Sequence, residues 1–452
     1  MRKACNRITS LSGFVGLCLV AVGLLANPWL LSHISGVGIV TLQGKILLVF
    51  FEVFIVVGGL LVFFKGNTPT GRKHVAFGLV TVLLVILAIE GCLHLINLVV
   101  RIPDLERNPY AGLSLRSPYQ GEEWAETYFE LLGDLRRPYE QYVGWQASEF
   151  HSEYINVDSG GVRKTWNPEH HTGELPATIY VFGGSTVWGL GARDDFTIPS
   201  RLSKLLHDDG HSFVVHNYGE MGYTFTQEIV RLTLLLREGD RPDYVVFYDG
   251  IADVQTACQS GIPGTTYRLS SIRETLRAGQ DKPSPGLVWD TISTLFTRHS
   301  MIYRAIDRLA DNASAQWQPC DVASDYSDED LQLLAVGIAE YYLNSMEALD
   351  RLAEAYNFEY VCFWQPITCM EAKVTDEEAE YALRRDTEIG KLCRMTADHL
   401  AAGSPPLFFD ISHALGERTS TYYIDWSHLS EEGNEVVAAR IFEIFKNLFL
   451  RE

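Results

Sequence analysis

Several common site signatures are missing from this sequence of 452 residues. It has no Cys-x-x-Cys pair, no zinc-ligand spacing, no phosphate-binding glycine loop and no internal repeat. These absences argue against a zinc site, a P-loop nucleotide site and a repeat protein, so we expect no metal and no cofactor. Eight cysteines are scattered along the chain, three in the first hundred residues and five beyond them. An odd five cannot all pair, although one disulfide is compatible with an extracytoplasmic domain.

Positive charge is scarce outside the N-terminal region. The chain carries a net charge of −20, yet residues 1–100 hold seven Lys/Arg and two acids, a net of +5, which leaves −25 for the remainder. Phosphate backbones require basic surfaces, so the acidic body argues against a nucleic-acid partner. The chain therefore divides into a cationic apolar head and an acidic body large enough for one domain with an insertion.

Three long apolar runs occupy that head, over residues 8–31, 46–64 and 75–100. Each is near or above the ~18–20 residues that cross a bilayer as a helix, so we expect residues 1–100 to form a membrane anchor of three transmembrane helices. The first run is also compatible with a signal peptide, because basic residues precede it and Ala26 lies near a plausible cleavage position. The exact number of spans therefore stays open.

Basic residues set the expected orientation of the head. They flank the first run and fill the second loop, and they predict that both segments face the cytoplasm: Arg2, Lys3, Arg7, Lys65, Arg72 and Lys73. Three spans then place the acidic body outside the cytoplasm, on a multi-pass protein of the cell membrane. Three ionisable residues lie within or near the spans, where they are either functional or paired at the interface: Glu52, Glu90 and His94.

The body is organised around the stretch from Ala177 to Leu206. The apolar run 177–182 predicts a buried strand, which ends at Gly183-Gly184-Ser185 and is followed by a helical stripe over 198–206. A strand, a glycine turn, a serine and a helix can expose a nucleophilic hydroxyl beside free backbone N–H groups. Alternatively, Ser185 is only a helix cap. The Gly-x-Ser-x-Gly elbow of α/β-hydrolases does not fit, because Val187 stands where its second glycine belongs.

A second informative stretch is Tyr422-Tyr-Ile-Asp-Trp-Ser-His-Leu-Ser430. Asp425 and His428 are three residues apart, just before a predicted helix over 430–448. A carboxylate this close to an imidazole can fix the ring's tautomer, and the ring can then take a proton from a serine. A capped helix start would explain Ser430 and the glutamates that follow it, but it would not explain Asp425 or His428.

Four blocks in this order resemble those of the SGNH (GDSL-type) hydrolases. They are Gly183-Gly-Ser-Thr186, Asn217-Tyr-Gly-Glu-Met-Gly-Tyr-Thr224, Tyr248-Asp-Gly-Ile-Ala-Asp253 and Asp425-Trp-Ser-His428. The resemblance spans about 180–448 and implies a flavodoxin-like, three-layer α/β/α domain with a parallel sheet. It implies Ser185 as nucleophile, His428 as base and Asp425 as its orienting acid. It also implies that the N–H groups of Ser185 and Gly222 bind the oxyanion.

One position departs from that pattern. The family's Gly-x-Asn-Asp is Gly250-Ile-Ala252-Asp253 here, and Ala252 has no side-chain donor. Loss of one oxyanion donor typically costs about 100- to 1,000-fold in rate. Either the site is weakened, or another group substitutes, or the domain no longer catalyses. Asp249 and Gln255 are nearby in sequence, but neither is an obvious replacement.

The remaining sequence predicts alternating strands and helices, and hence a parallel sheet with its site at the strands' carboxyl ends. Predicted strands cover 177–182, 213–216, 244–247, 359–364 and 407–409, and further helices cover 226–238, 331–356 and 375–400. Residues 101–172 are expected to form a juxtamembrane stalk and lead-in, and 173–452 the hydrolase-like domain. An insertion at about 258–327 is either a lid or a surface excursion. The pair His170-His171 is interpreted as surface.

These features together predict a membrane-anchored serine esterase that either removes or transfers an acyl group. Its substrate would be an ester, such as the acetyl groups of a surface or exported polysaccharide, an extension that rests on analogy. Two alternatives stay open: a catalytically impaired glycan-binding or scaffold domain of a membrane export complex, and a lipase or thioesterase. The sequence does not predict the oligomeric state.

Overall fold

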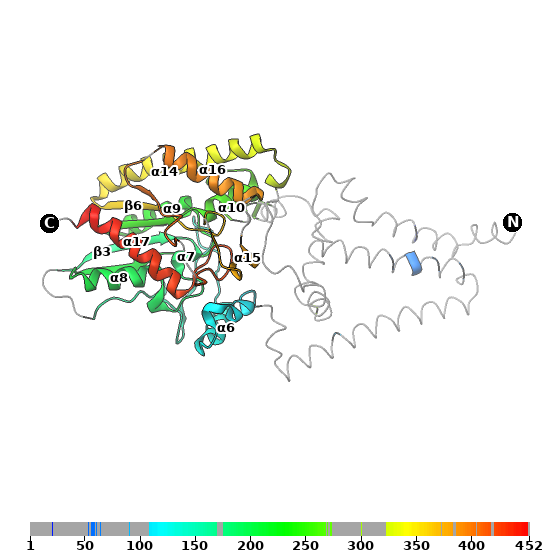
Figure 1. The fold of residues 1–452 in the computed structure, drawn as a ribbon, viewed down its shortest axis with the longest axis horizontal. Coiled ribbons are helices and arrows are strands. Elements are labelled where there is room, and N and C mark those ends of the chain that lie inside the picture. Colours follow the sequence, from blue (N-terminus) through cyan, green and yellow to red (C-terminus); the bar gives the residue numbers. More distant parts are fainter. Residues whose placement is uncertain are drawn as a thin grey trace. The chain divides into compact units, whose positions relative to one another are not determined.

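A computed structural model describes residues 108–169, 175–267, 322–371, 373–382, 386–403, 405–416 and 420–450, with a few isolated positions elsewhere. Contacts divide the chain into two units, 1–107 with 278–315 and 108–277 with 316–452. Nearly all described elements belong to the second unit (Figure 1). No helix within these described ranges is long and apolar enough to span a membrane. The predicted spans 8–31, 46–64 and 75–100 lie outside those ranges.

The second unit is built on one parallel sheet of five strands. The strands follow the spatial order β4-β3-β5-β6-β7, with all neighbours parallel. They are β3 (Ala177–Gly183), β4 (Phe213–Asn217), β5 (Tyr244–Asp249), β6 (Glu359–Trp364) and β7 (Phe408–Asp410). In chain order this is 2-1-3-4-5, the flavodoxin-like order. The predicted α/β fold with a parallel sheet is confirmed.

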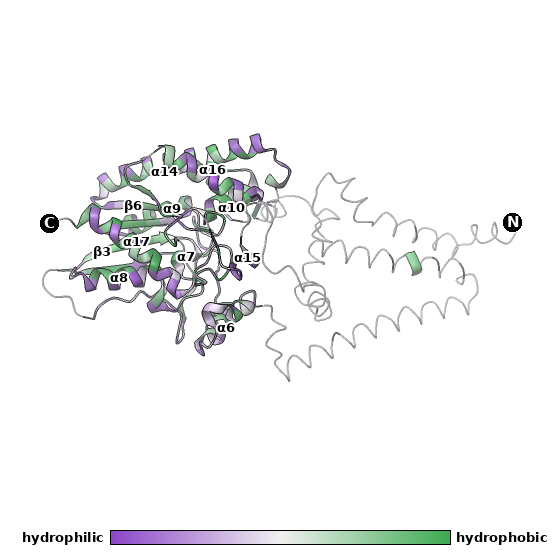
Figure 2. Cartoon of the chain, in the orientation of Figure 1, coloured by the Kyte–Doolittle hydropathy of each residue, from purple (hydrophilic) through white to green (hydrophobic). Residues whose placement is uncertain are grey.

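Successive side chains of each strand point to opposite sides of the sheet, so the sheet has two apolar faces. Helices cover both faces. Odd-numbered positions of β3, such as Ile179 and Val181, pack against α8 (Ile198–Asp208) and α17 (Glu431–Phe449). Even-numbered positions, such as Tyr180 and Phe182, face the core built with the other four helices. Those four are α9 (Phe225–Glu238), α10 (Ile251–Ser260), α14 (Asp328–Tyr356) and α16 (Glu388–Gly403) (Figure 1). Both hydrophobic and hydrophilic residues run along α14 and α16, as expected for helices with one buried side (Figure 2).

Residues 108–169 pack onto the carboxyl edge of the sheet. They contain η2 (Ala111–Leu115), η3 (Ser117–Tyr119), α6 (Trp124–Asp134), β1 (Phe150–His151) and β2 (Asn156–Val157). Tyr128 and Phe129 of α6 are fully buried in a third apolar cluster, which also contains Trp188 and Ile424. Tyr128 Oη donates to the carbonyl of Gly189 at 2.9 Å. The segment expected to be a stalk and lead-in thus packs against two loops, the one that contains Gly189 and the one that contains Ile424.

The predicted helix over 375–400 is wrong in its first half. The structure has a single turn, α15 (Glu378–Tyr381), after which Ala382 is extended, and α16 begins only at Glu388. The buried Glu378 carboxylate accepts the N–H groups of Tyr422 and Tyr423 at 2.9 and 3.0 Å. These long-range hydrogen bonds fix α15 against the loop that carries Asp425, and they compete with a continuous helix.

Other predictions from the sequence concern residues that the structure does not describe. His170 and His171 lie there, as do Glu52, His94 and most of the predicted insertion 258–327. Glu90 is one of the isolated described residues, and its Oε2 accepts a hydrogen bond from Ser300 Oγ at 3.1 Å.

Candidate active site

Ser185 stands directly at the carboxyl end of β3, on a short helical turn. Gly184 is the N-cap of α7 (Ser185–Trp188), and Gly189 ends that turn in the left-handed region. The first residue of a helix has no partner for its N–H within the helix. Ser185 therefore combines a hydroxyl with a free backbone donor at the edge of the sheet, where ligands of such folds bind.

Ser185, His428 and Asp425 lie in one hydrogen-bonded row. Ser185 Oγ is 2.6 Å from His428 Nε2, and His428 Nδ1 is 2.7 Å from Asp425 Oδ2. An ionised carboxylate only accepts hydrogen bonds, so Nδ1 carries a proton and Nε2 is left to accept the serine O–H. The side chains of His428 and Asp425 are each 14% exposed, which leaves the row partly shielded but accessible.

The loop around Asp425 holds that carboxylate in its charged form. Asp425 Oδ1 accepts the backbone N–H groups of Ser427 and His428 at 2.9 and 2.8 Å. Burial works against ionisation of Asp425, but the attraction of His428 and these hydrogen bonds outweigh it, so the pKa of Asp425 is lowered. Ser430 caps α17 immediately afterwards by accepting the N–H of Gly433 at 3.3 Å, as the sequence predicts.

The loop after β4 brings a second backbone donor to the site. Gly222 adopts φ +72°, a conformation that favours glycine, and its N–H has no acceptor among the described residues. Glu220 fixes this loop, because its carboxylate accepts the N–H groups of Ala147 and Met221 at 2.6 and 2.8 Å. Arg137 Nε adds a third contact to the same carboxylate at 3.1 Å. The loop is thereby tied to the lead-in segment.

Close packing of glycine joins this loop to the turn of Ser185. A Cβ atom on Gly219 would lie 2.4 Å from the backbone nitrogen of Trp188 and 2.8 Å from the carbonyl carbon of Val187. Both distances are shorter than any tolerated contact, so only glycine lets the two loops approach. A Cβ atom on Gly184 would lie 3.6 Å from the carbonyl of Tyr223 and 4.0 Å from Ala252 Cβ. The first three sequence blocks therefore meet at one point.

Ala252 stands at the second residue of α10, after Gly250 with φ +137°. Its methyl group supplies no hydrogen bond to the site. Asp249, one of the two neighbours considered from sequence, is buried and accepts a hydrogen bond from Tyr342 Oη at 2.9 Å. It therefore points into the core, and it is not a substitute donor.

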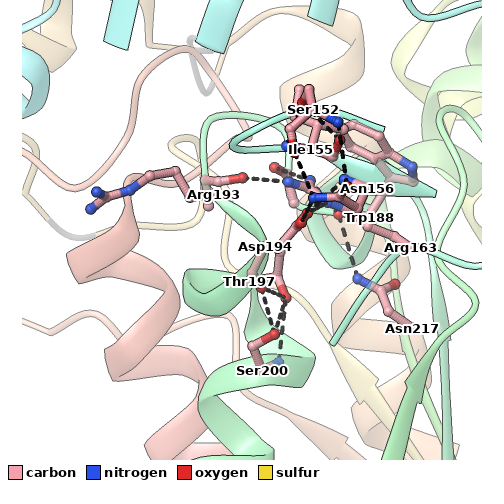
Figure 3. Close-up of polar contacts among 12 residues, drawn as sticks. Ser152, Ile155, Asn156, Arg163, Trp188, Arg193, Asp194, Thr197, Ser200 and Asn217 are labelled. Carbon is pink, nitrogen blue, oxygen red and sulfur yellow. Dashed lines mark hydrogen bonds and ion pairs between the residues drawn. The ribbon is translucent and has the colours of Figure 1, made fainter. Parts of the chain in front are cut away.

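A fully buried arginine supports the loop that follows Ser185 (Figure 3). Arg163 donates from Nη1 to the carbonyls of Trp188 and Gly189, both at 2.8 Å. Its Nη2 donates to the carbonyl of Ala192 at 2.7 Å, and its Nε lies 3.1 Å from Asp194 Oδ1. The guanidinium also stacks on the Trp188 ring, 4.2 Å from the centroid. This one side chain thus satisfies three carbonyls of the loop.

Two half-buried aromatic rings flank Gly222. A Cβ atom there would lie 3.6 Å from Trp145 Cζ2 and 3.7 Å from Tyr267 Cδ1. Trp145 is held by a hydrogen bond from Nε1 to the carbonyl of Met221 at 2.7 Å. Aromatic side chains with a few precisely placed polar groups are typical of small-molecule sites.

The structure joins Ser185, His428 and Asp425 by hydrogen bonds. It also places Ala252, and the carbonyl of Tyr223 that follows Gly222, beside Gly184, the residue before Ser185. The sequence reasoning missed Arg163, Glu220 and Trp145. Arg163 and Trp145 are single residues outside any motif, and their partners come from distant segments. Glu220 lies within the second sequence block, but its contacts with Arg137 and Ala147 are not visible from that block. For Arg163 and Trp145, the one signal in the sequence is the mixture of charged and aromatic residues in 137–166, which is unusual for a simple linker.

Comparison with known proteins gives only distant similarities. No protein-family model matches the chain, and no curated protein matches it either. One similar solved structure is a member of the lipolytic G-D-S-L family from Veillonella parvula, with 11% identity, 60% of this chain and 100% of that chain covered, and a TM-score of 0.33. Another is a lipase/acylhydrolase from Enterococcus faecalis, with 16% identity, coverage of 60% and 96%, and a TM-score of 0.29. The geometry of the site, and not these similarities, carries the functional conclusion.

Proposed function

We propose that this protein is a serine esterase of SGNH type, in which Ser185 is the nucleophile, His428 the general base and Asp425 the residue that orients it. The observation that carries the proposal is the unbroken row from Ser185 Oγ through His428 to Asp425, with contacts of 2.6 and 2.7 Å. A serine hydroxyl is a weak nucleophile until an adjacent base takes its proton.

The reaction proceeds in two halves through an acyl-enzyme. Ser185 Oγ attacks the ester carbonyl while its proton passes to His428 Nε2, and the imidazolium then protonates the departing alcohol. In the second half His428 removes a proton from the acceptor, whose oxygen attacks the acyl carbon. The bond from that carbon to Ser185 Oγ then breaks as His428 returns the proton to Oγ. Water as the acceptor gives hydrolysis, and a sugar hydroxyl gives acyl transfer. The N–H groups of Ser185 and Gly222 are the proposed donors to the oxyanion.

We extend the proposal to acylated glycans as the ester substrate. Trp145 and Tyr267 support this extension, because they present half-buried rings beside Gly222, where the acyl carbonyl would lie. Ring faces of this kind suit the flat apolar side of a sugar. A short acyl group such as acetyl is the simplest ester on such a substrate.

We further propose that the catalytic unit lies outside the cytoplasm, anchored by the apolar N-terminal region. The distribution of basic residues in 1–100 supports this orientation. A disulfide at Cys258 agrees with it, because disulfides persist mainly in oxidising compartments.

One alternative has a specific observation in its favour. Ala252 removes a side-chain donor from the oxyanion site, which would suit a domain that binds acylated glycans without cleaving them. Such a domain would gain nothing from the Ser185–His428 contact, whereas a hydrolase requires it. The contact therefore favours the esterase.

The direct test is hydrolysis of p-nitrophenyl acetate by the purified full chain. Wild type should turn over the ester, and Ser185→Ala should lower kcat by at least 1,000-fold, because no other group replaces the nucleophile. Ser345→Ala is the matched control, since Ser345 Oγ only donates to the carbonyl of Tyr341 within α14. Equal rates for wild type and Ser185→Ala would leave glycan binding as the better account.

A further inference from the structure

Gln365 presents a buried amide donor that has nothing to bind. It directly follows β6, at the same carboxyl edge of the sheet as Ser185, and the residue is 2% exposed. Its Nε2 has no hydrogen-bond partner among the described residues. An unsatisfied buried donor costs about 1–3 kcal/mol, so its presence calls for a reason.

Backbone pairing places Gln365 beside the start of α10. Asp249 pairs with Trp364 across β5 and β6, and the N–H of Gln365 donates to the carbonyl of Asp249 at 2.9 Å. A Cβ atom on Gly250 would lie only 3.4 Å from Gln365 Cγ. Gln365 therefore packs against the residue that caps α10, two positions before Ala252.

The same segment also borders the loop of the proposed base. Thr368 donates from its N–H and its Oγ1 to the carbonyl of Trp426, at 3.2 and 2.9 Å. Trp426 lies between Asp425 and His428. Gln365 thus belongs to a segment that touches the Ala252 side of the site at one end and the catalytic loop at the other.

We propose that the carboxamide of Gln365 supplies the third hydrogen bond to the oxyanion, the one that Ala252 cannot give. When Ser185 attacks, the carbonyl oxygen gains negative charge, and a donor aimed at that charge accelerates the reaction. Because the charge exists only during the reaction, the amide is unpartnered in the resting protein. This assignment rests on the proposed esterase function and identifies a residue that contacts the reacting atoms.

The first experiment replaces the amide by an apolar group of similar size in the full chain. Gln365→Leu should lower kcat for p-nitrophenyl acetate by about 100-fold and change KM by less than about threefold, because the donor acts only in the transition state. Gln259→Leu is the matched control. It removes another buried, unpartnered amide, seven residues beyond Ala252 on the same helix, about 10 Å away. Its kcat should match that of wild type.

A second pair of variants separates a direct role from a structural one. Ala252→Asn offers a new amide on the other side of Gly250, so in the Gln365→Leu background it should restore kcat at least tenfold. In the wild-type background, where a donor is already present, it should change kcat by less than about threefold. Gln365→Met, which keeps the size but removes the donor, should lower kcat as Gln365→Leu does, with little change in melting temperature.

The outcomes distinguish this inference from the proposed function. An active wild type with an equally active Gln365→Leu, or a gain from Ala252→Asn that is the same in both backgrounds, would overturn the role of Gln365 and leave the esterase intact. A wild type as inactive as Ser185→Ala would remove both proposals together.

Discussion

At the scale of single residues, His428 couples two groups that the chain supplies from distant positions. Ser185 precedes it by 243 residues, whereas Asp425 precedes it by three. The near partner fixes the ring through the loop's own geometry, and the distant partner arrives through the packing of β3 against its neighbours. The site therefore depends as much on the approach of the loops as on the three side chains.

Gly219 controls that approach most directly. Gly219→Ala would place a methyl group 2.4 Å from the backbone nitrogen of Trp188, an atom that cannot rotate away. We expect it to lower the free energy of unfolding by about 1–3 kcal/mol or more, the usual cost of overpacking, and to reduce activity because α7 must shift. Urea denaturation and ester hydrolysis measure the two effects.

The control for this change is Gly112→Ala in η2, where a Cβ atom would meet nothing within 4 Å. It should leave stability and activity close to those of wild type. A Gly219→Ala variant as stable and active as the control would show that the two loops are not tightly packed.

Individual site residues differ in how far the sequence reveals them. Ser185 follows an apolar strand and two glycines, and Asp425 and His428 share one loop, so their local patterns indicate their chemistry. Arg163 and Gln365 carry no such pattern. Their roles come from carbonyls and glycines of other segments, which only the folded chain brings within reach.

At the scale of elements, the loop after α7 depends on one buried ion pair. Arg163→Leu would leave the buried carboxylate of Asp194 without its cation, and it would remove the guanidinium's hydrogen bonds to the carbonyls of Trp188, Gly189 and Ala192. Removing one partner of a buried pair typically costs about 3–5 kcal/mol. We expect a loss of this order in urea denaturation, together with a loss of ester hydrolysis.

Arg440→Leu is the matched control, because the pair of Arg440 and Glu443 is exposed by 49% and 65%. Exposed pairs contribute little, so its unfolding free energy should stay within about 0.5 kcal/mol of wild type. If Arg163→Leu were no worse than Arg440→Leu, the buried network would not support the loop.

The missing first half of the predicted helix 375–400 has a physical explanation. Acidic helix formers fill this stretch, and local propensity alone favours a continuous helix. Glu378 instead accepts the N–H groups of Tyr422 and Tyr423, and Tyr381 Oη donates to the carbonyl of Tyr423 at 2.8 Å. A helix prediction from sequence has no access to these long-range partners.

At the scale of the whole molecule, the fold buries three interacting carboxyl groups in its core. Glu228, Asp249 and Asp253 come from α9, β5 and α10, and each is at least 95% buried. Burial raises the pKa of all three, and that of Asp249 to about 7. Repulsion from Asp249 raises the pKa of Glu228 and Asp253 further. Tyr342 and the thiol of Cys362 are their other titratable neighbours.

These raised pKa values predict a pH dependence of stability. Between about pH 4 and pH 7 the folded protein holds protons that the unfolded chain has released, so the free energy of unfolding falls as pH rises through this window. The expected loss is on the order of 1–4 kcal/mol. Urea denaturation at pH 5 and pH 8 measures it, and Asp249→Asn should reduce the difference. The control Glu329→Gln, at an exposed position of α14, should leave the difference between pH 5 and pH 8 unchanged. A stability that is flat or rises over this window would contradict the raised pKa values of these carboxyl groups.

The overall architecture is the part that the sequence predicts best. Five apolar runs, each ending in a turn and separated by helical stripes, are enough to predict a parallel α/β sheet. Strand order and register are not visible in such a pattern, because they depend on which apolar faces pack together. The membrane anchor predicted for residues 1–100 stays a prediction.

The most direct test of the central claim is labelling of the full chain with a serine-directed fluorophosphonate, followed by mass spectrometry of the peptides. The account predicts one modified residue, Ser185, with no label on Ser185→Ala and much slower labelling of His428→Ala, because only the serine that gives its proton to His428 is activated. A wild-type chain that stays unlabelled, or one labelled equally after Ser185→Ala, would contradict the claim that Ser185 is a catalytic nucleophile.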